Sequence, residues 1–152
     1  KGKVKGDAWL GEGDDVYKNK GDAKTKGLID SREGNDKLVL GNKTDKLLFD
    51  TALNASTNVD RIKKFESKDD KMYLDDDIFT SLTPGQLSSS QFHKGSSAQD
   101  ADDYIIYNKG SGALYYDQDG VGGANQVQFA QLDPNTKLKA SDFLVGEYSF
   151  VI

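Results

Sequence analysis

Aspartates and glycines alternate with single large apolar residues in the first third of the chain, and this combination suits binding of a hard cation. Asp36 and Leu38 recur nine residues later as Asp45 and Leu47. Carboxylates and backbone carbonyls are the ligands that calcium prefers, and a nine-residue repeat is typical of a parallel β-roll whose turns bind calcium. The spacing therefore predicts calcium binding between stacked turns.

The elements that would position these ligands are strands of about three residues separated by turns of about six. Counting back nine residues from Leu38 gives Ile29, and Tyr17 lies twelve residues before Ile29. We interpret the three extra residues as an insertion in the turn at 18–26, so that the period continues upstream. The residues predicted to point into the roll are Trp9, Tyr17, Ile29, Leu38 and Leu47.

Successive half-turns of a roll lie on alternate sides, so one ion needs two loops that are two repeats apart. Asp36 and Asp45 are one repeat apart and should not share an ion. Asp15 and Asp36 are 21 residues apart, which is two repeats plus the insertion, so their loops should stack on the same side. Gly27 occupies the position opposite Asp45. We therefore expect few ions in the roll, about one. The predicted site comprises Gly11, Glu12, Gly13, Asp15, Glu33, Gly34 and Asp36.

A second candidate calcium site is formed by Asp117 and Asp119, which precede Gly120. Asp-x-Asp-Gly begins many oxygen-ligand loops, and its glycine permits the sharp bend. The bidentate glutamate expected near the end of such a loop is missing, so a glycine-rich surface turn through 122–123 explains the stretch equally well. The acidic run at 75–77 is interpreted as a solvated turn, because three adjacent side chains should not all face one ion.

The composition narrows the class of protein. A chain of 152 residues is long enough for one or two small domains, and 16 glycines with two prolines indicate a turn-rich β architecture. The net charge of −5 argues against nucleic acid as a partner, because phosphates are bound by Lys and Arg. The absence of cysteine excludes thiol catalysis, Cys-bound zinc and disulfides. No apolar run approaches the roughly 18 residues of a membrane span.

Beyond residue 50 the nine-residue period is lost, and the pattern predicts an antiparallel region. Two strands are expected within 59–74, a hairpin at 104–107 and 113–117, and further strands at 126–132 and 147–152. A short helix is expected at 82–92, with Thr83 as its N-cap and Pro84 at its first position. The predicted fold is all-β: a short, degenerate parallel β-roll at 1–50, capped by an antiparallel β-sandwich-like region at 51–152.

Several stretches resemble the RTX family of secreted bacterial proteins, whose nonapeptide is Gly-Gly-x-Gly-x-Asp-x-apolar-x. The degenerate repeats around Asp36 and Asp45 match part of this motif. The stretches at 58–65, 100–107, 112–120 and 127–130 resemble the C-terminal region that follows RTX repeats. The resemblance covers most of the chain. It implies a non-catalytic, calcium-binding C-terminal module of a larger protein that is secreted or displayed on the bacterial surface.

The same resemblance implies a route of export. The apolar end of the chain, 142–152, resembles the uncleaved C-terminal signal that type I secretion machinery reads. Modules of this kind fold when they meet external calcium, and clustered carboxylates explain why ion binding and folding would be one equilibrium. Because the sequence begins with Lys1 inside a repeat-like stretch, without an N-terminal signal peptide, we expect it to be a piece of a longer protein.

Two other functions stay open from the residues alone. A carbohydrate-binding or adhesion module, with polysaccharide as its partner, would use exposed aromatics such as Trp9 or Tyr115, although strand aromatics are more often half-buried core. An enzyme is the third alternative. His93 is the single histidine, which makes a multi-histidine metal site impossible, and the serines at 88–90 lack a nucleophile elbow. Carboxylates are too numerous to single out a glycosidase pair, so no catalytic residues are predicted.

Overall fold

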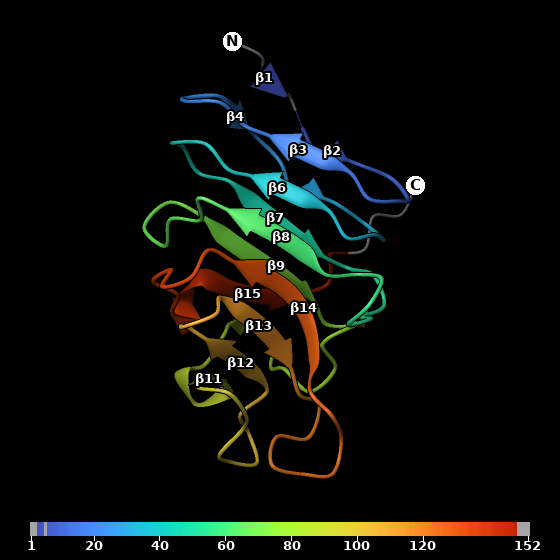
Figure 1. The fold of residues 1–152 in the computed structure, drawn as a ribbon, viewed down its shortest axis with the longest axis vertical. Coiled ribbons are helices and arrows are strands. Elements are labelled where there is room, and N and C mark those ends of the chain that lie inside the picture. Colours follow the sequence, from blue (N-terminus) through green and yellow to red (C-terminus); the bar gives the residue numbers. More distant parts are fainter. Residues whose placement is uncertain (1–2, 5, 149–152) are drawn as a thin grey trace.

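The computed structural model describes residues 3–4 and 6–148, and over these residues the protein is all β, as predicted. Two 3-10 turns, η1 (Ser89–Gln91) and η2 (Ala140–Asp142), are the helical elements of the described ranges. Figure 1 shows the strands stacked along the long axis of the molecule. The strands are β1 (Lys3–Val4), β2 (Ala8–Trp9), β3 (Val16–Lys18), β4 (Lys24–Thr25), β5 (Ile29–Asp30), β6 (Lys37–Val39), β7 (Lys46–Phe49), β8 (Asp60–Lys63), β9 (Lys71–Asp75), β10 (Gly85–Gln86), β11 (Phe92–Lys94), β12 (Ile105–Asn108), β13 (Ala113–Tyr116), β14 (Val127–Leu132) and β15 (Phe143–Gly146).

Two sheets contain most of these strands. The six-stranded sheet has the order β10-β15-β9-β7-β5-β2, and the seven-stranded sheet has the order β11-β12-β13-β14-β8-β6-β3. From β2 to β9, consecutive strands alternate between the two sheets, apart from β4, which pairs with β1. Every pair within this stretch is parallel. The chain from Ala8 to Asp75, called the coil below, thus winds back and forth between two sheets (Figure 1).

The register of the coil agrees with the counting of repeats. Tyr17 lies opposite Leu38, 21 residues later, and Ile29 lies opposite Leu47, 18 residues later. The predicted insertion of three residues is confirmed by these pairings. It contains β4, an extra strand that pairs with β1 outside the two main sheets.

Parallel winding continues past residue 50. Strand β8 lies parallel to β6, and β9 lies parallel to β7. The period disappears from the sequence because the connecting loops lengthen: Lys37 pairs with Arg61 and Lys46 pairs with Lys71, spacings of 24 and 25 residues. Antiparallel pairing begins later, in β12-β13-β14 and in β10 with β15. The change of pairing therefore lies further along the chain than the expected boundary at 50/51.

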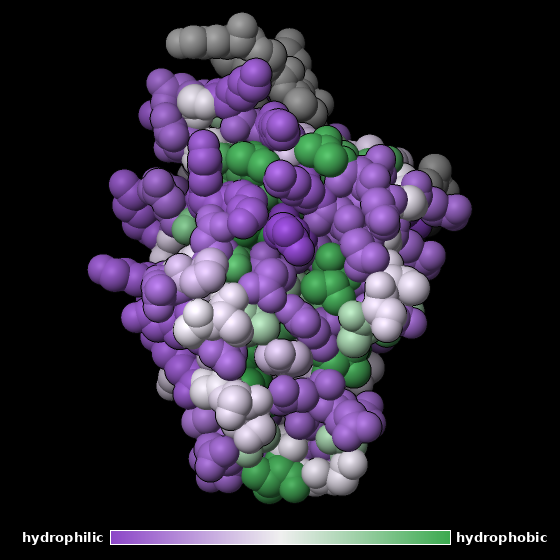
Figure 2. Space-filling model, in the orientation of Figure 1, coloured by the Kyte–Doolittle hydropathy of each residue, from purple (hydrophilic) through white to green (hydrophobic). Residues whose placement is uncertain are grey.

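A single apolar core fills the space between the sheets. Four of the five residues predicted to point inward contact this core. Trp9 was the wrong choice, since it is 49% exposed. Its neighbour Ala8 pairs with the buried Ile29, and successive strand residues point to opposite faces, which places Trp9 on the outer face. Figure 2 shows that hydrophilic residues cover most of the face in view.

The predicted helix at 82–92 is absent. Gly85 has a φ of 110°, which a right-handed helix cannot accommodate, and Gly85–Gln86 instead forms β10, antiparallel to β15. The predicted hairpin is confirmed as β12 and β13. Of the expected terminal strand at 147–152, residues 149–152 lie outside the described residues, and the described strand ends earlier, at Gly146.

Candidate metal centre

The two loops predicted to share an ion lie against each other. The backbone N–H of Asp15 donates to Oδ1 of Asp36 over 2.7 Å, and the N–H of Gly13 donates to the carbonyl of Glu33 over 3.1 Å. A Cβ on Gly34 would lie 2.1 Å from the Gly13 carbonyl oxygen, so only glycine permits this approach. The inference from the 21-residue spacing, that these loops stack on the same side, is confirmed.

Most of the predicted residues border one shallow cavity of about 440 Å³. Glu12, Gly13, Glu33 and Gly34 line it together with Asp14. The remaining wall consists of Ala52, Leu53, Asn54, Thr57 and Asn58, from the loop that precedes β8. Carboxylates and glycine carbonyls at the mouth of one cavity form a donor set suited to a calcium ion.

Asp15, Asp36 and Asp60 occupy equivalent positions in three successive windings, directly before or at the start of β3, β6 and β8. We call them the carboxylate row. The backbone N–H of Asp36 donates to Oδ1 of Asp60 over 3.3 Å, which repeats the contact between Asp15 and Asp36. The buried Oδ2 atoms of Asp15 and Asp36 have no hydrogen-bond donor. Two carboxylate oxygens in this state indicate a place for a cation or a proton.

Burial sets the protonation behaviour of the row. Asp60 is 3% exposed, and desolvation raises its pKa to about 8, although a hydrogen bond from Oγ of Ser31 over 2.6 Å opposes this change. Desolvation also raises the pKa of Asp36, which shares a side-chain hydrogen bond with Asp60. The sequence prediction missed Asp60. Its signal was present, because Asp60-Arg61-Ile62 repeats the pattern of Asp36-Lys37-Leu38.

On the opposite edge of the coil, Asp45 uses both oxygens in hydrogen bonds. Its Oδ1 accepts from Nδ2 of Asn19 over 2.5 Å, and its Oδ2 accepts from the N–H of Gly41 over 3.0 Å. The N–H of Asp45 donates to Oδ1 of Asp70 over 2.9 Å, and burial raises the pKa of Asp70 to about 6. Asp70 is a second carboxylate that the counting missed. This edge joins neighbouring windings without leaving a free oxygen on Asp45.

A further group of carboxylates lies where β5, β7 and β9 end. Oδ2 of Asp30 and Oδ1 of Asp50 are buried without a donor. The two groups share a side-chain hydrogen bond, and burial, with the nearby charge of Asp50, raises the pKa of Asp30 to about 7. Arg32, 3.8 Å from Asp30, is the cation that faces the pair. The sequence analysis did not identify this pair, because nothing local in the sequence indicates burial of Asp30.

Asp75 belongs to the same edge and begins the acidic run at 75–77. The three side chains can each place one carboxylate oxygen within 4.8 Å of the other two. The argument that adjacent aspartates should not face one point is therefore wrong here. The turn brings them together: the N–H of Asp77 donates to Oδ1 of Asp75 over 2.9 Å.

The second predicted site, Asp117 and Asp119, lies beside another acidic loop. The N–H of Asp119 donates to Oδ1 of Asp117 over 3.3 Å, and the buried Oδ1 of Asp119 has no donor. The next loop residues contact the stretch at 100–103, where Asp100, Asp102 and Asp103 form a second group with carboxylate oxygens within 4.8 Å. The N–H of Val121, for example, donates to the carbonyl of Asp100 over 3.2 Å. The sequence analysis did not select the Asp100 group.

His93 faces a carboxylate. Its Nδ1 lies 3.6 Å from Oδ2 of Asp103, whereas Ser88 and Ser90 contact each other through their hydroxyls over 3.0 Å. Within the described ranges no serine hydroxyl bonds to this histidine. The arrangement offers no Ser-His pair to support nucleophilic catalysis.

In the described part of the chain, no helix has the length and hydrophobicity needed to cross a membrane. No family model, curated protein or solved structure matches this chain.

Proposed function

We propose that this chain is a non-catalytic calcium-binding module of a larger secreted protein of the RTX type, and that calcium drives its folding. The observation that carries the proposal is the pair of buried Oδ2 atoms on Asp15 and Asp36, which have no donor. They lie in two loops that are held in contact and that also offer glycine carbonyls. A divalent cation would supply the missing partner.

The overall balance of buried charge supports the same conclusion. Nine aspartates are buried among the described residues: Asp30, Asp36, Asp45, Asp60, Asp70, Asp75, Asp103, Asp117 and Asp142. Their ion pairs involve Arg32, Lys71 and His93. Burying a carboxylate without a counter-charge is costly, so the folded state favours a proton or a cation. Oxygen-only donor sets with flexible geometry suit calcium better than zinc or copper.

Thermal unfolding followed by circular dichroism tests the calcium proposal. Calcium at about 100 times its dissociation constant should stabilise the folded state by about 2.7 kcal/mol, which for a domain of this size is about 5–10 °C in Tm. Magnesium at the same concentration should act less, because it requires a stricter octahedral geometry. Identical melting curves in chelator and in calcium would contradict the proposal.

Export by type I secretion machinery is a separate part of the proposal and rests on the resemblance of the stretch at 142–152. Deleting 146–152 should reduce export from a cell that carries a cognate transporter. The matched control deletes the exposed tip at 122–123, distant from the chain end. Normal export of the first variant would remove the support for a C-terminal signal.

A further inference from the structure

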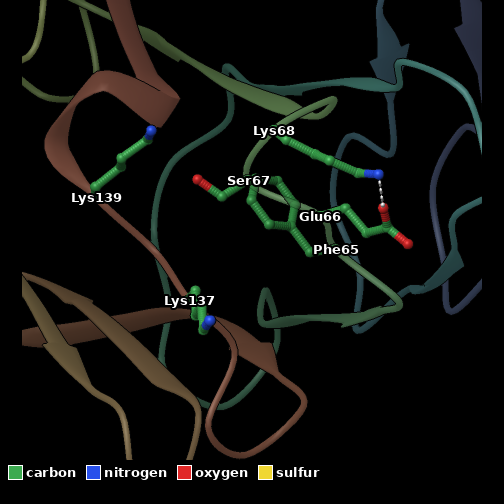
Figure 3. A pocket seen from close by; sticks show the side chains of 6 residues that line it. All are labelled: Phe65, Glu66, Ser67, Lys68, Lys137 and Lys139. Carbon is green, nitrogen blue, oxygen red and sulfur yellow. Dashed lines mark ion pairs between the residues drawn. The ribbon is translucent and has the colours of Figure 1, made fainter.

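A cavity of about 540 Å³ lies on the part of the surface formed by the turn between β8 and β9 and by the segment that precedes η2. Its lining residues are Phe65, Glu66, Ser67, Lys68, Lys137 and Lys139. Figure 3 shows the ring of Phe65 in the middle of the group, with the lysines arranged around it. These residues are far apart in the sequence, and none belongs to the acidic sites described above.

The lining is positively charged, although the chain as a whole is negative. Three lysines and one glutamate give the lining a formal charge of +2, against −5 for the whole chain. The glutamate is already engaged, since Oε2 of Glu66 lies 3.6 Å from Nζ of Lys68 (Figure 3). Lys137 and Lys139 form no ion pair with any described carboxylate. The cavity therefore offers two ammonium groups to an anion.

A buried carboxylate fixes the two walls relative to each other. Asp142 is fully buried, and its Oδ2 accepts from Oγ of Ser67 over 2.7 Å and from the N–H of Lys139 over 3.0 Å. Its Oδ1 accepts from Nζ of Lys71 over 3.1 Å. One side chain thus joins the β8–β9 turn to the segment that carries the lysines. A binding site gains affinity when its walls are ordered before the ligand arrives.

The apolar floor restricts the kind of anion. The ring of Phe65 is 6% exposed and belongs to the core, so it presents a small rigid apolar surface. Aromatic rings contact the flat C–H face of a sugar ring, and lysine ammonium groups attract a carboxylate as point charges. The volume is within the usual range for small-molecule sites. A hexuronate ring combines one apolar face with one carboxylate, and so matches both features.

We propose that this cavity binds a carboxylate-bearing sugar, a uronate unit of an acidic saccharide, through Lys137 and Lys139 over the ring of Phe65. The site is independent of the calcium centres, because its anchor is Asp142 with Lys71 and none of its lining residues belongs to the carboxylate row.

The test titrates isotope-labelled protein with trigalacturonate by NMR, at a fixed saturating calcium concentration and again in chelator. We expect shifts at Phe65 and Ser67, and a Kd at least about tenfold tighter than for the neutral maltotriose. Replacing both lysines, Lys137→Ala with Lys139→Ala, should weaken binding about tenfold or more. The control pair, Lys43→Ala with Lys109→Ala, removes two exposed lysines outside the cavity and should leave the Kd unchanged.

Four results would overturn the proposal. They are an absence of binding, equal binding of maltotriose, equal binding of inorganic phosphate or hexaglutamate, and equal weakening by the two double variants. The third would assign a general anion or acidic-peptide site in place of a saccharide site. The Lys137→Ala, Lys139→Ala variant should keep the calcium-dependent rise in Tm. Failure of the calcium proposal would appear in those melts, whereas failure of the saccharide proposal would appear in the titrations.

Discussion

Replacing Asp60 with asparagine should stabilise the metal-free protein in mild alkali. Asp60 is buried in the carboxylate row, where burial raises its pKa to about 8. Asparagine has nearly the same shape, keeps an oxygen that can accept from the N–H of Asp36 and from Ser31, and never ionises. The substitution therefore removes the charge and preserves the contacts between windings.

The magnitude follows from proton linkage. In the unfolded chain an aspartate has a pKa of about 3.9, so below that pH Asp60 is protonated in both states and its contribution to stability is fully present. As the pH rises toward about 8, the unfolded chain ionises while the folded protein retains the proton, and this stability is lost. The loss is about 1.4 kcal/mol per pH unit, or about 4 kcal/mol between pH 5 and pH 8. Because Asp36 shares the proton, about 2–4 kcal/mol is expected, equivalent to roughly 5–15 °C in Tm.

The assay compares thermal melts of the wild-type protein and of Asp60→Asn in chelator between pH 5 and pH 8. The wild-type Tm should fall as the pH rises, and the variant should fall less, with a residual slope from Asp30 and Asp70, whose pKa values are also raised. Asp22→Asn, at an exposed position, is the matched control and should follow the wild type. A wild-type Tm that stays level or rises with pH, or a variant with an unchanged slope, would refute the reasoning.

Two further substitutions test the geometry of the loops. Asp36→Ala should reduce the calcium-dependent rise in Tm more than Asp45→Ala, because Oδ2 of Asp36 has no donor whereas both oxygens of Asp45 accept hydrogen bonds; equal reductions would count against a site in the carboxylate row. Gly34→Ala should lower the free energy of unfolding by roughly 2–4 kcal/mol in denaturant titrations, because its Cβ would lie 2.1 Å from the Gly13 carbonyl oxygen at a φ of 138°. Gly123→Ala, which adds a Cβ with no heavy atom within 4 Å, is its control and should change stability by less than about 0.5 kcal/mol.

The first windings of the coil could be predicted from the sequence because their spacing is nearly regular. Counting in nines, with one insertion of three residues, placed Asp15 beside Asp36 and Gly27 opposite Asp45, and the strand register agrees with both. The count works because the strand faces repeat with a period of two, so an error of one residue would have reversed which side chains are buried. Trp9 shows this sensitivity, since it lies one residue from the inward position.

The later windings could not be predicted by counting. The loops before β8 and β9 extend the spacing to 24 and 25 residues, and no repeat shorter than the loops survives in the sequence. Asp60 and Asp70 were missed for this reason, even though each keeps the local Asp-x-apolar pattern of Asp36. The pairing of Asp30 with Asp50 depends on where two strands end in space. That is a property of the assembled sheet rather than of either segment.

The location of the carboxylates follows from the same alternation that builds the core. In β6, Leu38 points inward, and Asp36, two residues earlier, lies on the same side at the point where the strand leaves its turn; Asp60 stands in the same relation to Ile62. Each winding that buries an apolar residue therefore also brings a carboxylate to the edge of the core, where backbone N–H groups of the neighbouring winding satisfy one oxygen. The second oxygen depends on what the turn supplies. Asn19 and Gly41 supply donors to Asp45, whereas the Oδ2 atoms of Asp15 and Asp36 receive none. We therefore expect the need for protons or cations to vary from winding to winding with the donors in each turn, and not with the number of aspartates.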